Sequence, residues 1–466
     1  MRSLVLIVSL TLISISSASA QQAVVDWTNV HQRIDGFGAT APFIGDGNHN
    51  LTTAQQNFFF GTGDGQLGLS LLRVGLTDGH SSPGDCTSVS VSCAGANVSD
   101  MVAAIAKGAR IYASPWSPPA AYKTNGSVTC TAGSGNGALA TASYGAYATW
   151  LANFVKSLKT ENNITLYAIS IQNEPDMCVS YDGALWTSAQ FDTFIKNNLG
   201  PTFASAGLST LIFAPENGIY QGMTGAHGGG TCLADAACYN YVGGINFHDY
   251  DATANSSGSV SGAPNPWSSL GKKYWETEVS CGIGYGPSGC ESGFTTDMGK
   301  DGLMWAGLID DRLVNANVNA YLYWALLAGT SDNEGLETTG GAIAQRAYVF
   351  GQYSRFVRPD YFRIDATHTP QSGVSVSAYQ NTSTGTLVII ATNYTASAKS
   401  QAFSIVNAPG FTAVTPYVTS SSLSLAAQSS VTISSNSFTY SLPASSVTTF
   451  VGTMIAPPTN VKAVPH

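Results

Sequence analysis

The chain has 466 residues, of which 44% are hydrophobic and 10% are charged, and its formal net charge at pH 7 is −9. A chain of this length can bury a large core and is expected to form more than one domain. The acidic balance and the small number of charged residues argue against nucleic acid or an anionic membrane as a partner.

The first twenty residues have the features of a secretory signal. Arg2 gives a charged start, an apolar run covers residues 4–15, and small residues close the segment at positions 18–20. The run is shorter than the roughly 18 apolar residues that a membrane span needs. We therefore expect a signal peptide at residues 1–20 and a secreted protein, extracellular or periplasmic.

Eight cysteines follow this segment, and an even number in an exported chain favours disulfides over metal sites. Their spacing suggests three local loops and leaves a fourth pair: Cys86–Cys93, Cys232–Cys238, Cys281–Cys290 and Cys130–Cys178. Because no Cys-x-x-Cys with partner histidines is present, structural zinc is not expected. We predict no metal and no cofactor.

Between residues 34 and 357, apolar strand-like stretches alternate with helical patterns, which are clearest at Tyr144–Leu158, Gly302–Val314 and Ile343–Phe356. Eight strands are predicted: Ile34–Ala39, Leu69–Leu76, Arg110–Trp116, Leu166–Gln172, Thr210–Pro215, Gly243–Tyr250, Lys273–Val279 and Ala320–Leu327. Strands that are apolar on both faces and separated by helices indicate a parallel sheet, here an α/β fold of the (β/α)8 TIM-barrel type. A doubly wound sheet is the competing fold, but Gly36-Phe37-Gly38 lacks the third glycine and the helix of a dinucleotide-binding loop.

After residue 357 the sequence consists of short, β-branched, Ser/Thr-rich segments without helical periodicity. This composition predicts an all-β sandwich over residues 358–455. The early stretch Ala23–Trp27 also reads as a strand, so residues 21–33 are predicted to join that sandwich. Prolines at 457, 458 and 465 mark residues 456–466 as a linker or a frayed end.

Polar and aromatic residues stand at the carboxyl ends of the predicted strands, where a barrel of this type places its active site. They are Arg73, Trp116, Asn173, Glu174, Glu216, His248, Tyr250, Glu278 and Trp324. Glu174 precedes Pro175, which cannot pair as a strand residue, and a carboxyl group at the end of a buried strand is costly without a task or a partner. We expect these side chains to face one cavity.

Two carboxyl groups at this edge suit the cleavage of a glycosidic bond. One protonates the departing oxygen, and the other attacks the anomeric carbon or activates water. Glu174 and Glu278, on the fourth and seventh strands, would meet across the barrel mouth. A gap of roughly 5 Å would predict retention through a covalent intermediate. Arg73 beside Glu278 would keep that carboxylate ionised, and Asn173 could donate to the sugar's 2-hydroxyl.

Two stretches resemble the retaining glycoside hydrolases of clan A: Gln172-Asn173-Glu174-Pro175 and Tyr274-Trp275-Glu276-Thr277-Glu278. With Ile34–Gly38, Arg110–Pro119, Phe247–Tyr250 and the β-rich tail, the chain resembles glycoside hydrolase family 30. This resemblance implies a (β/α)8 barrel with a side β-sandwich made from both chain ends. It also implies a polysaccharide substrate. We expect the protein to be a monomer.

By the same resemblance, Glu174 corresponds to the acid/base and Glu278 to the nucleophile. Asn173 corresponds to the sugar-binding residue before the acid/base. Arg73 corresponds to the arginine that supports the nucleophile, and Tyr250 to the sixth-strand aromatic residue near it. The resemblance thus gives each of the five a role around one sugar.

Other strand-end residues admit more than one interpretation. Trp116 and Trp324 offer apolar faces and correspond by the resemblance to walls of the subsite for the cleaved sugar. His248 is a candidate substrate contact. A role in holding the loop that follows it, at Asp249, is preferred over a direct role in proton transfer. Glu216 is interpreted as structural or as a rim contact. Glu276 shares the face of Glu278 by strand alternation, so it should point into the barrel one layer deeper and is the rival nucleophile.

The substrate is the least determined prediction. The resembled family includes enzymes acting on glucuronoxylan, xylan, β-1,6-glucan, β-1,6-galactan and glucosylceramide, and the Trp-Ser-Pro-Pro run at 116–119 favours the xylan-active branch. The glucuronoxylan-specific branch uses an arginine after strand eight, but residues 328–335 contain none. We therefore predict an endo-xylanase or xylobiohydrolase that does not depend on glucuronate, with a β-1,6-glycanase or a glucosylceramidase-like enzyme as alternatives. A non-catalytic carbohydrate-binding barrel is the alternative of another class, although such a barrel should have lost Glu174 or Glu278.

Overall fold

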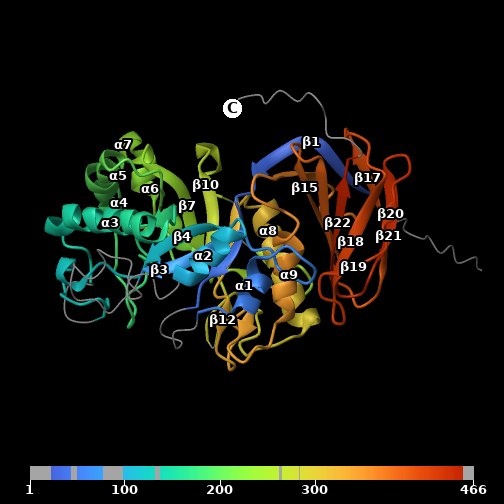
Figure 1. Cartoon of the computed structure of the whole chain (residues 1–466), viewed down its shortest axis with the longest axis horizontal. Coiled ribbons are helices and arrows are strands. Elements are labelled where there is room, and N and C mark those ends of the chain that lie inside the picture. The colour runs from blue at the N-terminus through green and yellow to red at the C-terminus, as the bar shows by residue number, and fades with distance from the viewer. Residues whose placement is uncertain are drawn as a thin grey trace, which may run out of the picture.

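The computed structural model describes residues 22–42, 50–76, 98–131, 137–261, 265–282 and 284–454. Figure 1 shows two units side by side: a barrel with its covering helices, and a β-rich unit formed mainly by the C-terminal residues. The expected signal peptide, the expected pair Cys86–Cys93 and the tail at residues 456–466 lie outside the described residues.

The barrel consists of eight parallel strands that close in the order β10-β11-β2-β3-β4-β5-β6-β7. Their bounds are β2 Gly36–Thr40, β3 Leu71–Leu76, β4 Arg110–Pro115, β5 Leu166–Ser170, β6 Leu211–Phe213, β7 Val242–His248, β10 Lys273–Glu278 and β11 Ala320–Tyr323. Each predicted strand overlaps one of these, so the predicted TIM barrel is confirmed.

Helices cover the outside of the barrel. The α-helices of the described residues are α1 Thr53–Phe60, α2 Val98–Ala106, α3 Tyr144–Asn162, α4 Ser188–Phe194, α5 Gly200–Ser205, α6 Gly230–Ala234, α7 Ala236–Tyr239, α8 Leu303–Val314 and α9 Gln345–Ser354, with π-helical turns η4 Ile195–Leu199 and η7 Met298–Gly302. Single 3₁₀ turns lie at η2 Ala120–Tyr122, η3 Thr141–Ser143, η5 Tyr220–Thr224 and η6 Ser268–Leu270. Helix α3 runs past its predicted end and stops at Asn163, whose φ of 55° is a left-handed conformation that asparagine tolerates.

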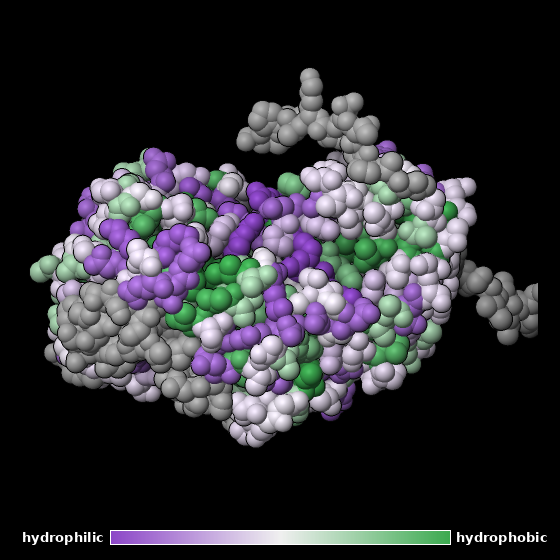
Figure 2. Space-filling view, in the orientation of Figure 1, coloured by the Kyte–Doolittle hydropathy of each residue, from purple (hydrophilic) through white to green (hydrophobic). Residues whose placement is uncertain are grey.

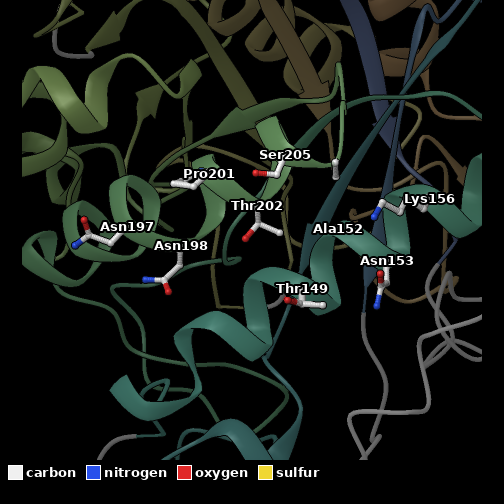
Figure 3. Close-up of a pocket in the computed structure, with 10 residues that line it drawn as sticks. Thr149, Ala152, Asn153, Lys156, Asn197, Asn198, Pro201, Thr202 and Ser205 are labelled. Atoms are coloured by element: carbon white, nitrogen blue, oxygen red, sulfur yellow. The ribbon is translucent and has the colours of Figure 1, made fainter.

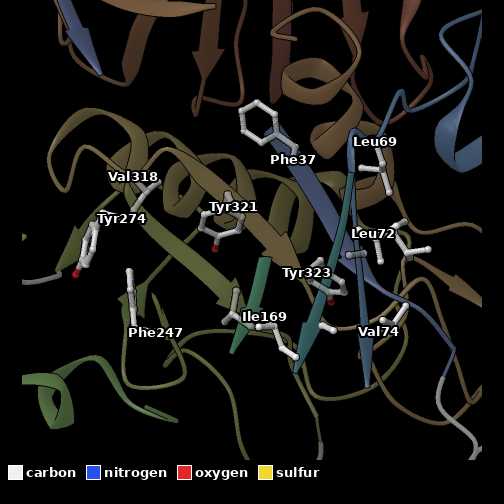
Figure 4. Close-up of a cluster of buried hydrophobic side chains, with 14 of the residues drawn as sticks. Phe37, Leu69, Leu72, Val74, Ile169, Phe247, Tyr274, Val318, Tyr321 and Tyr323 are labelled. Atoms are coloured by element: carbon white, nitrogen blue, oxygen red, sulfur yellow. The ribbon is translucent and has the colours of Figure 1, made fainter. Parts of the chain in front are cut away.

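Side chains alternate across the barrel wall. The inward layer contains Leu71, Tyr112, Ala168, Phe213, Trp275, Ala320 and Leu322. The outward faces pack against the helices, where Figure 4 shows Ile169, Phe247, Tyr274 and Tyr321 among others. Below the inward layer, Trp275 Nε1 donates to Asp35 Oδ2 at 2.9 Å. The lower barrel is therefore filled, which leaves the carboxyl ends of the strands as the open end.

The β-rich unit is a ten-stranded sheet with the order β19-β18-β22-β16-β15-β14-β1-β17-β21, and β20 pairs with β18. Its strands are β1 Ala23–Arg33, β14 Phe362–Ala366, β15 Val374–Asn381, β16 Thr386–Asn393, β17 Lys399–Val406, β18 Ala413–Thr419, β19 Ala426–Ala427, β20 Val431–Thr432, β21 Ser437–Leu442 and β22 Ser446–Thr453. The two halves face each other across one core, because Phe403 on β17 lies 5.2 Å from Phe450 on β22 between ring centroids. The predicted side sandwich with an N-terminal strand is confirmed.

Helices α8 and α9 join the two units. Gln352 Nε2 on α9 donates to Thr419 Oγ1 at 2.8 Å, and Thr449 Oγ1 donates to the Gln352 carbonyl at 2.8 Å. Two small ribbons, β8 Thr253–Ala254 with β9 Val260–Ser261 and β12 Leu327–Ala328 with β13 Glu337–Thr338, lie in loops after barrel strands. On the face shown in Figure 2, apolar residues show in separate areas among polar ones. Across the described ranges, no helix is long and apolar enough to cross a membrane.

Candidate active site

The backbone after β5 and β6 sets the position of Glu174. The Asn173 amide donates to the Pro115 carbonyl at 2.7 Å, and the Glu174 amide donates to the Glu216 carbonyl at 3.1 Å. Glu174 and Glu216 have φ angles of 47° and 66°, in the left-handed region that glutamate rarely adopts. Such conformations persist only where the surrounding structure enforces them, and they concentrate at functional sites.

Glu174 and Glu278 meet at the barrel mouth. One carboxylate oxygen of each, together with a ring nitrogen of His248, lies within 4.8 Å of the others. Glu278 accepts hydrogen bonds from Arg73 Nη1 at 2.5 Å and from the Tyr250 hydroxyl at 2.9 Å. Only 8% of the Glu174 side chain and 7% of the Glu278 side chain are exposed. The two carboxyl groups can therefore act on the two atoms of one bond in a largely dehydrated cleft.

Arg73 connects the polar groups beneath this pair. Its Nη2 atom donates to Asn173 Oδ1 at 2.6 Å and lies 3.3 Å from Glu216 Oε1. The guanidinium is fully buried and its Cζ atom lies 4.6 Å from the centroid of the Trp116 ring. Because Asn173 uses its oxygen on Arg73, its amide N–H groups remain to face a ligand.

Two tryptophans form a wall beside Arg73. The Trp116 and Trp324 ring centroids are 5.8 Å apart with an interplanar angle of 41°. The structure thus brings together every strand-end residue predicted to act on substrate: Glu174, Glu278, Arg73, Trp116, Asn173, His248, Tyr250 and Trp324.

His248 faces three carboxylates. Its Nδ1 atom lies 3.2 Å from Glu174 Oε1 and 3.7 Å from Glu278 Oε1, and its Nε2 atom lies 3.8 Å from Glu216 Oε1. Burial lowers the pKa of His248, but the three carboxylates outweigh burial and raise it to about 10. The following residue, Asp249, is held by Arg312 Nε at 2.7 Å. His248 therefore belongs to the carboxylate cluster, and the interpretation that it holds the next loop is not supported.

The same cation separates the pKa values of the two glutamates. Burial raises the pKa of Glu278, and the negative charge of Glu174 keeps it raised although His248 and Arg73 oppose the shift. Burial also raises the pKa of Glu174, but the hydrogen bond and charge of His248 outweigh it and lower the pKa. His248 Nδ1, which lies 3.2 Å from Glu174 Oε1, is therefore the cationic proton donor that faces Glu174.

Glu216 lies beneath the pair and is fully buried, so the rim-contact interpretation is wrong. It accepts hydrogen bonds from the Tyr112 hydroxyl at 2.6 Å and from Ser114 Oγ at 2.5 Å. Burial raises its pKa, but Arg73 and His248 lower it to about 2. Glu216 is thus an anion at neutral pH that holds the Arg73 and His248 cations in place.

Glu276 does not share the face of Glu278, which corrects the expectation from strand alternation. On β10, Glu276 pairs with Phe247 and Glu278 pairs with His248, so a bulge falls between the two glutamates. The Glu276 carboxyl accepts the backbone amides of Glu278 at 2.9 Å and Leu322 at 3.1 Å. It lies on the outward side with Phe247, and its two oxygens are engaged by backbone amides, so it is not placed to act as the rival nucleophile.

Tyr181 was missed in the sequence. Its hydroxyl donates to Glu174 Oε2 at 3.0 Å, although the residue is 50% exposed in the loop after β5. A signal was present, because Tyr181 follows the Asn-Glu-Pro motif closely and lies near Cys178.

The predicted pairs Cys130–Cys178, Cys232–Cys238 and Cys281–Cys290 are confirmed.

The cluster Glu174, His248 and Glu278 also has the spacing of a metal site. However, Arg73 and the protonated His248 already place two positive charges against these carboxylates, which disfavours a cation there. The arrangement suits proton transfer and nucleophilic attack better than metal binding.

A polar groove of about 420 Å³ lies away from this cluster, on the outside of the barrel (Figure 3). Residues of α3 and α5, such as Asn153, Lys156 and Thr202, line it together with Asn198. None of the predicted site residues contributes to it.

One family model and two relatives place the chain among known proteins. Residues 98–282 match the family model described as the glycosyl hydrolase family 30 TIM-barrel domain. The glucuronoxylanase XynC of Bacillus subtilis strain 168 is 30% identical over 442 residues, covering 93% of this chain and 92% of that protein. The family 30 subfamily 8 xylanase of Clostridium acetobutylicum is 31% identical with a TM-score of 0.76, covering 93% of this chain and 99% of that one.

A shorter match, 30% identical over 151 residues and 32% of this chain, is to the endo-1,6-beta-D-glucanase of Neurospora crassa, of which it covers 30%. The barrel, the paired carboxyl groups and the near full-length similarity to XynC agree with one another. This chain belongs to glycoside hydrolase family 30.

Proposed function

We propose that this protein is a secreted, retaining β-glycanase that cleaves β-1,4-xylan with Glu278 as nucleophile and Glu174 as acid/base. The observation that carries the proposal is the separation of at most 4.8 Å between carboxylate oxygens of Glu174 and Glu278. Retaining glycosidases hold these groups roughly 5–5.5 Å apart, whereas inverting enzymes need about 6.5–9.5 Å to admit water.

In the first step Glu278 attacks the anomeric carbon while Glu174 protonates the departing oxygen. Arg73 and Tyr250 hydrogen-bond to both Glu278 oxygens, which aims the carboxylate at the anomeric carbon and favours its charged form against the burial that raises its pKa. The neutral Glu174 that this step needs forms when a proton passes along the 3.2 Å contact from His248 Nδ1. In the second step Glu174 removes a proton from water, which releases the sugar from Glu278 with its configuration retained.

Xylan is the favoured substrate because the two relatives that match 93% of this chain are named as a glucuronoxylanase and a xylanase. A cation favours recognition of a glucuronate side group, and residues 328–335 after β11 contain no arginine or lysine. The nearby Arg346 is buried and bonded to Asp301 and Asn333. We therefore propose action on xylan without dependence on glucuronate.

Two further parts of the proposal concern location and a second substrate. Secretion is supported by the signal-like residues 1–20 and by three disulfides, which persist in oxidising compartments. Cleavage of β-1,6-glucan is the second candidate, because the matched relative from Neurospora crassa carries that activity in its name.

The test is reducing-sugar release from arabinoxylan, glucuronoxylan, β-1,6-glucan and β-1,6-galactan, with proton NMR of the first-formed product. We expect greatest release from both xylans and a β-anomer as first product. Glu278→Gln should abolish release. Activity of this variant equal to wild type would refute the nucleophile assignment, and an α-anomer as first product would refute retention.

A further inference from the structure

The loop that follows β5 presents an apolar surface next to Glu174. Tyr181 and Met177 are 50% and 39% exposed on this loop, and Ile219 is 40% exposed on the loop after β6. Between them, a Cβ atom on Gly218 would lie 2.6 Å from the Met177 sulfur and 3.1 Å from Glu174 Oε1. The missing side chain at Gly218 therefore lets Met177 and the Glu174 carboxyl come close together.

This loop is fixed on both sides of Tyr181. The Cys130–Cys178 disulfide anchors it before Tyr181. After Tyr181, the Gly183 amide donates to the Val128 carbonyl at 3.1 Å, and Lys123 Nζ donates to the Gly183 carbonyl at 2.7 Å. An aromatic ring held in this way can stack on a sugar with little loss of conformational entropy.

We propose that Tyr181 is the leaving-group platform of the cleft: its ring stacks on the pyranose beyond the scissile bond, and its hydroxyl orients the Glu174 carboxyl. The inference rests on the proposed role of Glu174 as proton donor, because the proton donor faces the departing sugar. An exposed aromatic face suits the C–H face of a sugar ring, and the 3.0 Å bond to Oε2 fixes the carboxyl against rotation. The ligand is the reducing-side pyranose unit of a β-linked oligosaccharide.

The two parts of Tyr181 are separable by substitution. In Tyr181→Phe the ring stays and the hydroxyl is lost, so kcat/KM on an oligosaccharide should fall about tenfold. The hydroxyl stabilises the Glu174 carboxylate, so its loss should also move the basic limb of the pH profile to higher pH. Tyr181→Ala removes the ring as well, and we expect a further fall of about tenfold, mainly in KM.

The experiment compares these variants on the longest oligosaccharide that the wild-type protein cleaves and on a dinitrophenyl glycoside, whose leaving group departs without protonation. On the dinitrophenyl glycoside, kcat/KM of Tyr181→Phe should equal that of wild type. The control is Tyr241→Phe, which should equal wild type on both substrates. Tyr241 suits this purpose because it is a 36% exposed tyrosine that lies against Gly200 outside the barrel. Equal losses of Tyr181→Phe on both substrates, or no loss of Tyr181→Ala on the oligosaccharide, would overturn the proposal. Failure of the proposed function would show differently, as activity that survives Glu278→Gln.

Discussion

Replacing Glu276 tests how the strand that carries Glu278 is held, without touching the cleft. Beside the bulge in β10, the Glu276 carboxyl accepts hydrogen bonds from the backbone amides of Glu278 and Leu322. Each buried amide left without an acceptor costs about 1–3 kcal/mol. Glu276→Leu should therefore lower the free energy of unfolding by roughly 2–6 kcal/mol. Glu276→Gln keeps one acceptor oxygen and should lose about half as much.

The same substitution should lower kcat, because the amide it releases belongs to the residue proposed to attack the sugar. Urea unfolding measures the stability, and initial rates at 10 °C below the unfolding onset measure kcat. Asp100→Leu is the matched control: Asp100 is buried and accepts the Leu51 amide at 3.2 Å, but on α2 outside the barrel. It should lose stability and keep kcat. If Glu276→Leu unfolds at the wild-type urea concentration, the two hydrogen bonds do not stabilise the bulge and the reasoning fails.

Three other predictions concern the cleft. Arg73→Met removes the guanidinium from the buried Glu278 and Glu216 carboxylates and leaves His248 as their cationic partner, so the free energy of unfolding should fall by about 3–5 kcal/mol; a stability equal to wild type in urea would contradict this. Glu174→Gln should reduce kcat/KM on xylan by about 10²–10⁴ but change kcat/KM far less on a dinitrophenyl glycoside, and equal losses of kcat/KM would exclude Glu174 as the proton donor. Because the pKa of His248 is raised, its contribution to stability is fully present below pH 6.5 and is lost as the pH rises towards 10. Because the pKa of Glu216 is lowered, its contribution is present above pH 4.5 and is lost as the pH falls towards 2. The temperature of thermal unfolding should thus be highest between about pH 4.5 and pH 6.5. His248→Gln should reduce the fall of this temperature at alkaline pH.

The barrel and the positions of its strand-end residues followed from sequence because both depend on regular features. Apolar stretches on both faces mark buried parallel strands, and barrel geometry then fixes where Arg73, Glu174 and Glu278 must meet. All eight strands run in the same direction, so their carboxyl ends lie at one end of the barrel. The family resemblance added roles to positions that the pattern had already selected.

Two features could not be read from the same pattern. The face of Glu276 depends on a single inserted residue in β10, and apolar alternation does not reveal a bulge among Glu276, Thr277 and Glu278. The position of Tyr181 depends on contacts between two loops, which strand periodicity does not describe. Both lie where local backbone geometry, rather than the repeat, decides where a side chain points.

Strand β1 has a consequence for biosynthesis. It pairs with β14 on one side and with β17 on the other, so the first described strand takes its place between strands made hundreds of residues later. During synthesis β1 must therefore wait, with unpaired edges, until nearly the whole polypeptide has emerged. A shortened chain that ends before β17 would keep one of these edges open, and we expect such a fragment to aggregate rather than to accumulate as a free barrel.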